Sequence, residues 1–150
     1  MARANGRPSG RPIKNEFSFV NTAWRRLANR KTLLACREVP LLGRAIDLAL
    51  EKEGAVFGFE FKLRDWRRAL VQARDHRLAV DYAYICMPKR AVPDVMRRAL
   101  LDSGVGLAFY SRNREWPFEI VVEAPKSTDV WPAAREALLR YLRHNSNQSR

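Results

Sequence analysis

Hydrophobic and polar residues alternate along two neighbouring stretches near the middle of the chain. In the second stretch, Phe57, Phe59 and Phe61 alternate with the small Gly58 and the acidic Glu60. Successive side chains of a β-strand point to opposite sides, so an alternation of period two predicts a strand with one apolar face. The other face of this predicted strand carries small and charged groups.

The preceding stretch, residues 44–52, alternates in the same way. Ile46, Leu48 and Leu50 are expected to share the apolar face, and this places Asp47 on the opposite face among small neighbours. Each of the two predicted strands therefore carries an acid on the face away from its large apolar residues.

A short connection that contains a glycine joins the two strands, and this predicts an antiparallel hairpin. A two-residue loop, Glu53-Gly54, would place Asp47 directly opposite Glu60. A four-residue loop would place Asp47 opposite Gly58, with Glu60 as its diagonal neighbour. In both registers the two carboxylates share a face, with opposed Cβ atoms about 5 Å apart. A three-residue loop would separate them unless a bulge restored the register.

Two carboxylates at this separation repel each other by roughly 3 kcal/mol at an effective dielectric constant near 20. Either one of them is protonated or a cation lies between them. Lys62 follows Glu60 on the same face and supplies one positive charge. Two interpretations result: a structural Asp–Glu–Lys network on a solvated sheet face, or a site for a divalent metal with a lysine beside it.

The rest of the pattern alternates helices with strands. Asn15 is a candidate N-cap for a first helix that runs to about Asn29, and Pro93 and Pro132 suit the first turns of two later helices. The predicted order is helix 16–29, strand 32–39, the hairpin of residues 44–63, helix 64–73, strand 81–87, helix 93–103, strands 105–110 and 118–123, and helix 132–143.

Asp47, followed thirteen residues later by Glu60-Phe61-Lys62 across a hairpin, resembles the signature of the PD-(D/E)xK nuclease superfamily. Ile46 stands where that signature has a proline, which is a departure that the superfamily tolerates. The next helix and the tyrosine-rich strand after it come in the order that the superfamily places after its E-x-K motif.

The resemblance covers roughly residues 16–88. It implies an α/β fold with a restriction-endonuclease-like α-β-β-β-α-β core, in which helices flank a mixed sheet. The remaining pattern would extend this core by a C-terminal helix-strand-strand-helix unit.

The same resemblance implies roles for the central residues. Asp47 and Glu60 would ligate Mg²⁺ or Mn²⁺, and the Phe61 backbone carbonyl would complete the ligand set. Lys62 would orient the attacking water, lower its pKa by proximity, or contact the scissile phosphate.

Three further polar residues are candidates for the site. Gln72 would reach it from the helix to orient water or phosphate, or is a surface amide. Glu38 would add a metal ligand or a hydrogen bond to the site, or is an acid at the rim of the site. Glu16 resembles an acid that some members of the superfamily carry in their first helix, or is an acid that favours the positive end of the helix dipole.

The net charge of +12 and the pI of about 10.6 favour a polyanionic partner. Nucleic acid is the expected partner, with DNA favoured over RNA, although arginine-rich proteomes also produce basic chains. The candidates for phosphate contacts are all basic residues near the hairpin or in the N-terminal arm: Arg44, Arg64, Arg67, Arg68 and Lys14.

The length of 150 residues predicts one domain, residues 15–143, between a disordered basic arm of residues 1–14 and a disordered polar tail of residues 144–150. The chain has neither an apolar leader nor an apolar run of eighteen residues, which predicts a cytoplasmic protein without a membrane partner. Cys36 and Cys86 are expected to be buried free thiols. His76 is expected to pack or to be solvated rather than to act as a base.

The sequence therefore predicts a metal-dependent nuclease that hydrolyses phosphodiester bonds in DNA, in repair, recombination, restriction or a mobile element. The alternative is a catalytically inactive module of the same fold that binds nucleic acid as a scaffold. The intact Asp47, Glu60 and Lys62 favour the enzyme. A homodimer is compatible with both hypotheses.

Overall fold

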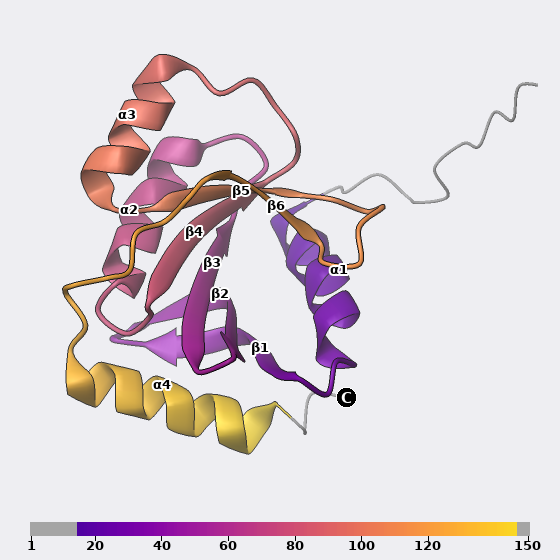
Figure 1. Cartoon of the computed structure of the whole chain (residues 1–150), viewed down its shortest axis with the longest axis vertical. Helices are drawn as coiled ribbons and strands as arrows, with labels where there is room; N and C mark the ends of the chain where they lie inside the picture. The colour runs from indigo at the N-terminus through magenta and orange to yellow at the C-terminus, as the bar shows by residue number, and fades with distance from the viewer. Residues whose placement is uncertain (1–14, 147–150) are drawn as a thin grey trace, which may run out of the picture.

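The computed structural model describes residues 15–146. Along the chain it has α1 (Glu16–Ala28), β1 (Leu33–Leu41), β2 (Arg44–Lys52), β3 (Ala55–Phe61), α2 (Trp66–His76), β4 (Tyr82–Met87), α3 (Asp94–Ser103), β5 (Gly106–Tyr110), β6 (Phe118–Val122) and α4 (Pro132–Asn145). This is the predicted α-β-β-β-α-β core followed by the predicted helix-strand-strand-helix extension (Figure 1). The predicted α/β fold class is confirmed.

The strands form one mixed sheet of six, in which the order across the sheet is the order along the chain. β1, β2 and β3 are antiparallel to one another, β3, β4 and β5 are parallel, and β6 returns antiparallel to β5. Parallel neighbours need a crossover connection. α2 provides the crossover between β3 and β4, and α3 provides the one between β4 and β5.

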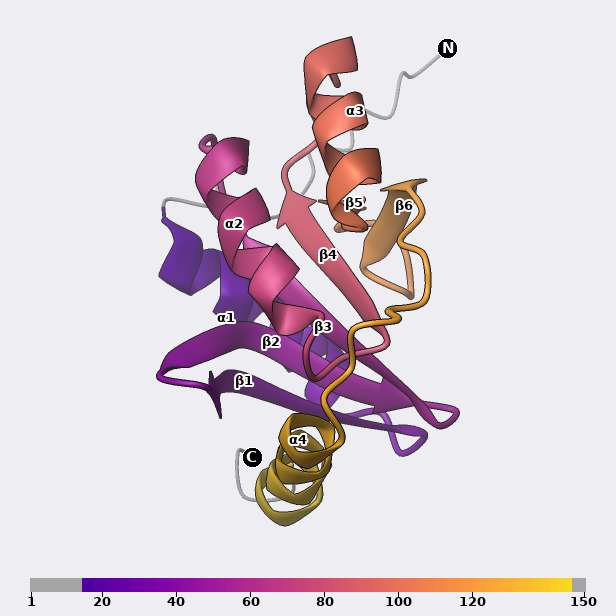
Figure 2. The same ribbon diagram turned by 90° about the vertical axis from the view of Figure 1, so that its left-hand side faces the viewer.

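Helices cover both faces of the sheet. α1 packs on one face, where its Phe19 and Leu27 join a core with Leu48 and Phe59. α2 and α3 pack on the other face, and they lie in front of the sheet in Figure 2. α4 lies along β1 and β2 at one end of the molecule. Glu60 is nevertheless buried within β3, an interior strand of the sheet.

The β2–β3 hairpin closes with the two-residue loop. Lys52 pairs with Ala55, and both loop residues, Glu53 and Gly54, have positive φ values of 52° and 82°. Two consecutive residues with positive φ match the tight turn whose twist suits a hairpin. In this register Asp47 and Glu60 form the next opposed positions beyond the last ladder pair, as the two-residue alternative predicted.

The expected shared face of Ile46, Leu48 and Leu50 is wrong for Ile46. Leu48 and Leu50 pack in the core beneath α1, whereas Ile46 packs in the core beneath α4 on the opposite face. The alternation changes at Asp47, where β2 no longer pairs with β3. On the other side of Asp47, Glu38 of β1 has a φ of 53° and interrupts the β1–β2 ladder. Both ladders are therefore irregular at the position of Asp47.

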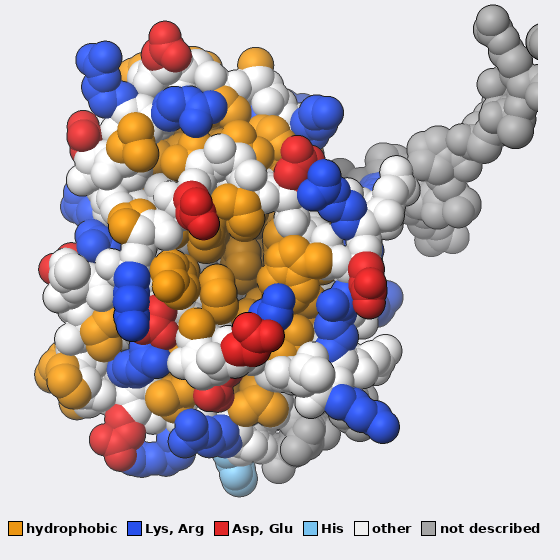
Figure 3. Space-filling view, viewed as in Figure 1, with side chains coloured by type: hydrophobic (Ala, Val, Ile, Leu, Met, Phe, Trp, Pro, Cys, Tyr) orange, Lys and Arg blue, Asp and Glu red, His pale blue; other side chains and the backbone are white. Residues whose placement is uncertain are grey.

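The face drawn in Figure 3 has a hollow lined by hydrophobic side chains, with acids and bases interspersed around it. The core on the α1 side includes half-buried hydrophobic residues such as Phe57, Tyr82 and Trp116. Basic side chains are scattered over this face rather than gathered on it.

The predicted arm of residues 1–14 and the last four residues of the predicted tail lie outside the described residues. α4 ends at Asn145, so the predicted boundary at residue 143 falls inside a helix. His144 suits the last turn, because a basic group favours the negative end of the helix dipole. Between residues 15 and 146, each helix is too short or too polar to cross a membrane.

Candidate active site

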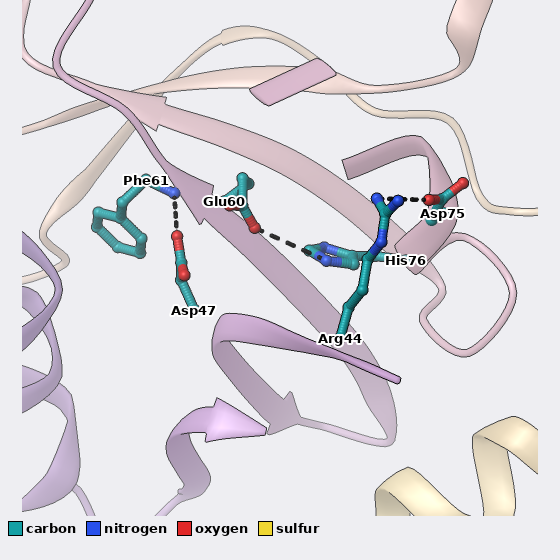
Figure 4. Close-up of polar contacts among 6 residues, drawn as sticks. All are labelled: Arg44, Asp47, Glu60, Phe61, Asp75 and His76. Carbon is teal, nitrogen blue, oxygen red and sulfur yellow. Dashed lines mark hydrogen bonds and ion pairs between the residues drawn. The ribbon is translucent and has the colours of Figure 1, made fainter. Parts of the chain in front are cut away.

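The carboxylate of Asp47 lies at the point where β2 separates from β3. Its Oδ2 accepts a hydrogen bond of 2.9 Å from the backbone N–H of Phe61 (Figure 4). A side chain thus occupies the position of the backbone carbonyl that a longer ladder would have provided. This hydrogen bond ties the open end of the hairpin together and fixes one oxygen of Asp47.

The carboxyl groups of Asp47 and Glu60 are close enough for each to shift the pKa of the other. Glu60 is buried, with 5% of its surface exposed. Burial, followed by the charge of Asp47, raises the pKa of Glu60 to about 9. Burial also raises the pKa of Asp47, although the Phe61 N–H opposes this shift. Near neutral pH the pair therefore holds a proton, unless a cation takes its place.

Lys62 and Glu38 act on this pair with opposite signs. The positive charge of Lys62 lowers the pKa of both carboxyl groups, and the negative charge of Glu38 raises both. Lys62 is half-buried, and its backbone N–H donates to the Cys86 carbonyl at 3.1 Å, which continues the attachment of β3 to β4. Glu38 is exposed on β1. The structure therefore brings both residues to the site, with Glu38 at its edge.

His76 is buried, which agrees with the expectation that it packs, and it packs directly against Glu60. Its Nε2 lies 3.7 Å from Oε2 of Glu60, and only 4% of the residue is exposed (Figure 4). Burial lowers the pKa of His76 to about 4, so the imidazole is neutral. A signal was present in the sequence: His76 continues the buried spacing of Trp66, Ala69 and Ala73 along α2.

Gln72 lies one turn before His76 on α2. Its Oε1 is buried and has no hydrogen-bond partner among the described residues, so Gln72 is not a freely solvated amide. The hydrogen bonds of the described part of the chain do not join it to Asp47 or Glu60. The structure therefore leaves its predicted role in orienting water or phosphate without a direct contact.

Glu16 occupies the first turn of α1, directly after the N-cap Asn15, whose side chain accepts from the Ser18 N–H. This is the position that the helix dipole favours for an acid. The acidic charge that acts on both Asp47 and Glu60 is that of Glu38. We therefore assign Glu16 to the helix terminus rather than to the site.

Arg44 begins β2, and its guanidinium forms a 3.2 Å ion pair with Asp75 of α2. Both side chains are more than half exposed, at 59% and 53%. Because an exposed ion pair contributes little stability, this contact holds the Arg44 side chain only weakly. The pair lies beside His76 in Figure 4.

Arg64, Arg67 and Arg68 are exposed around the first turn of α2, a few residues after Lys62. Arg67 stacks over the Trp66 ring at 4.3 Å, and the Arg64 carbonyl accepts from Arg90 at 3.4 Å. Arg90 follows β4 and is a basic neighbour that was not among the predicted contacts. Lys14 lies outside the described residues.

The donor set fits a hard divalent cation. Among the described residues Glu60 Oε2 is buried without a hydrogen-bond partner, so its carboxylate has unused acceptor capacity. Two carboxylates and a carbonyl such as that of Phe61 are oxygen ligands, which Mg²⁺ prefers and completes with water. Within residues 15–146, His, Cys, Asp and Glu do not form a metal-binding group of three or more. The set is therefore unlike the ligand sets of zinc.

No protein-family model and no curated protein matches this sequence. Among solved structures, the 1.60 Å crystal structure of an XisH family protein from Nostoc punctiforme PCC 73102 is similar to this chain. The superposition has a TM-score of 0.50 and 16% sequence identity, and it covers 67% of this chain and 97% of that chain. At this identity the similarity shows a shared fold.

Proposed function

We propose that this protein is a metal-dependent nuclease that hydrolyses phosphodiester bonds, with DNA as its substrate. The observation that carries the proposal is the carboxylate pair at the open end of the β2–β3 hairpin. The charge of Asp47 acts on Glu60 there, and one buried oxygen of Glu60 has no hydrogen-bond partner within residues 15–146. Burying two carboxylates beside each other is unfavourable, and a divalent cation between them would offset their repulsion.

In the proposed site, Asp47, Glu60 and the Phe61 carbonyl hold Mg²⁺ or Mn²⁺. When bound, such a cation supplies positive charge for the phosphoryl oxygens and lowers the pKa of a coordinated water. Lys62 orients the attacking water or contacts the scissile phosphate from the same edge of the sheet. The Phe61 N–H holds Asp47 in place throughout, because it binds the carboxylate directly at 2.9 Å.

The surroundings of the pair support a nucleic acid substrate. Arg64, Arg67 and Arg68 are exposed where α2 begins, next to the strand that carries Lys62, and could bind flanking phosphates. The net charge of +12 favours a polyanion. The fold shared with the XisH family protein, and the α-β-β-β-α-β order itself, are consistent with the resemblance to PD-(D/E)xK nucleases.

The second candidate is a catalytically inactive module that binds nucleic acid as a scaffold. Two observations favour it: the burial of Glu60 with a raised pKa, and the absence of a three-residue metal-binding group in residues 15–146. Both hypotheses predict binding that weakens steeply with salt, because phosphate contacts release counterions. Only the nuclease predicts metal-dependent cleavage.

The test is incubation with linear, nicked, branched and single-stranded DNA, and with matched RNA, with and without Mg²⁺ or Mn²⁺. Asp47→Asn keeps an acceptor for the Phe61 N–H but removes a charged ligand, and Lys62→Ala removes the lysine. We expect each to lower cleavage at least about 100-fold, since a metal-site group affects the transition state directly. Asp102→Asn and Lys126→Ala, at exposed positions away from the site, are the matched controls.

Cleavage that survives Asp47→Asn would come from a contaminant or from another site, and would contradict the assignment. If the parent protein cuts no substrate with either metal but binds DNA in a salt-dependent way, the nuclease hypothesis is wrong and the scaffold hypothesis is supported.

A further inference from the structure

We propose that His76 is a positioning residue for Glu60, whose Nε2–H donates to Glu60 Oε2 and orients that carboxylate toward Asp47 and the metal. This inference rests on the proposed metal site and adds a residue that the resemblance does not supply. It concerns how the site is held, and His76 itself touches neither substrate nor metal.

The contact joins two elements that the crossover brings together. His76 lies in the last turn of α2, and Glu60 lies near the end of β3. Figure 4 shows the imidazole edge facing the carboxylate, with 3.7 Å between Nε2 and Oε2. With both residues buried, water competes little for either atom. A closure of less than about 1 Å gives an ordinary hydrogen bond, and such bonds in metal-free sites tighten when the site is filled.

Buried polar atoms usually have partners, so two unpaired atoms in adjacent side chains need an explanation. Glu60 Oε2 and His76 Nδ1 are both buried without a hydrogen bond among the described residues. A proton on Nε2 supplies the partner that Oε2 lacks. A carboxylate offers about four lone-pair sites, so accepting from His76 leaves sites for the metal.

The same tautomer leaves Nδ1 as an acceptor. His76 lines a hollow of about 160 Å³ between α2 and the β1–β2 turn, together with Leu41, Leu42, Arg44 and Asp75. This hollow has room and polar neighbours for a water that could reach the imidazole. The environment therefore suits a neutral ring with its donor toward Glu60.

His76 would act on the metal only through its 3.7 Å contact with the ligand Glu60. Hydrogen bonds to the ligands of metal sites typically contribute 10- to 100-fold in metal affinity. We expect a contribution of this size from His76.

Two variants and one matched control separate positioning from the other roles that His76 could have. His76→Leu removes the hydrogen-bond donor and keeps an apolar group of similar size. His76→Gln places an amide N–H where Nε2 lies, so it restores the donor, although an amide is a poor metal ligand. His144→Leu changes the other histidine of the chain, which is exposed in α4.

The measurements are Mn²⁺ and Mg²⁺ affinity by calorimetry and thermal melting in chelator, neither of which needs cleavage. We expect His76→Leu to weaken the binding of both metals about 10- to 100-fold. We expect His76→Gln to stay within about threefold of the parent, and His144→Leu to match it. In chelator, His76→Leu should melt slightly below the parent and His76→Gln should recover this loss, because leucine leaves the buried Glu60 Oε2 without a donor.

Three outcomes would overturn the inference. If His76→Leu binds metal as tightly as the parent, His76 does not position Glu60. If His76→Gln loses Mn²⁺ affinity but keeps Mg²⁺ affinity, His76 is itself a ligand. If His76→Leu melts well below the parent and His76→Gln restores neither property, the role is structural.

The nuclease proposal fails in a different way. If the parent protein binds Mn²⁺ through Asp47 and Glu60 but cleaves no substrate, the proposed nuclease function is wrong. The proposed role of His76 in positioning Glu60 would still stand. A parent protein that binds neither metal overturns both proposals.

Discussion

The two ends of the β2–β3 hairpin are built on different principles. At the closed end, from the Lys52–Ala55 pair to the Leu48–Phe59 pair, backbone hydrogen bonds join the strands without interruption. At the open end the ladder stops. There the Asp47 side chain joins the two strands, because it accepts a hydrogen bond from the Phe61 N–H.

The difference shows where this fold can place a reactive group. Backbone pairing occupies main-chain donors and acceptors, and it directs side chains into packed faces. Where pairing stops, the free backbone N–H can hold a carboxylate, and the two acids can approach each other. The closed end should therefore control stability, and the open end should control metal binding at a moderate cost in stability.

The strongest test acts on the closed end. Phe59 is 1% exposed, and its ring stacks on that of Phe118 with centroids 4.3 Å apart. Phe59→Ala should lower the free energy of unfolding by about 3–5 kcal/mol, through lost burial and the cavity that remains. Urea unfolding in chelator measures this. A loss below about 1 kcal/mol would mean that the closed end does not determine stability.

The next test uses the pH dependence of the open end. In chelator, Glu60 stays protonated in the folded protein up to a pKa of about 9, whereas the unfolded chain ionises near 4.5. The unfolded state binds fewer protons between these values, so stability should fall as pH rises, by at most about 1.4 kcal/mol per pH unit. His76, with its pKa lowered to about 4, opposes this trend below pH 6.5.

Between pH 6.5 and about 9, the pH dependence of stability therefore reports on Glu60 without the opposing effect of His76. Glu60→Gln should make the stability of the chelated protein nearly independent of pH in this window, and saturating Mg²⁺ should cancel the fall in the parent. A parent whose stability is already flat from pH 6.5 to 9 in chelator would show that the raised pKa of Glu60 is wrong.

The smallest expected change in stability separates two roles of Asp47, which are to accept a hydrogen bond from the Phe61 N–H and to supply a charged metal ligand. Asp47→Ala leaves the Phe61 N–H without its acceptor, whereas Asp47→Asn keeps a carbonyl oxygen in reach. The alanine variant should be less stable than the asparagine variant by about 1–2 kcal/mol, the typical cost of an unpaired buried donor. Thermal melts of both in chelator decide this. Equal stabilities would mean that the hydrogen bond does not hold the open end together.

Much of this arrangement followed from local sequence patterns. Alternation and a glycine in the turn predicted the hairpin, and one of the two open registers placed Asp47 opposite Glu60. These features depend on neighbours a few residues apart, and such neighbours are visible in the sequence. The order of helices and strands followed for the same reason.

The features that the sequence pattern did not predict depend on tertiary packing. His76 meets Glu60 because the crossover through α2 returns across the sheet, and spacing alone does not indicate which strand residue a buried histidine will contact. The ion pair of Arg44 with Asp75 likewise joins positions 31 residues apart. Ile46 was misplaced because a strictly alternating strand was assumed at the position where β2 becomes irregular.

The order of the strands in the sheet has a consequence for how the protein folds. Every strand pairs with its neighbour in the sequence, and the antiparallel pairs β1–β2, β2–β3 and β5–β6 close through short loops, which favours their early formation, whereas the two parallel pairs require the crossovers through α2 and α3. Asp47 and Glu60, thirteen residues apart, come together with the second hairpin. During synthesis this hairpin leaves the ribosome before α2. The two acids can therefore come together before His76 packs against Glu60. The last step in assembling the site would then be the docking of a helix onto a preformed pair of strands.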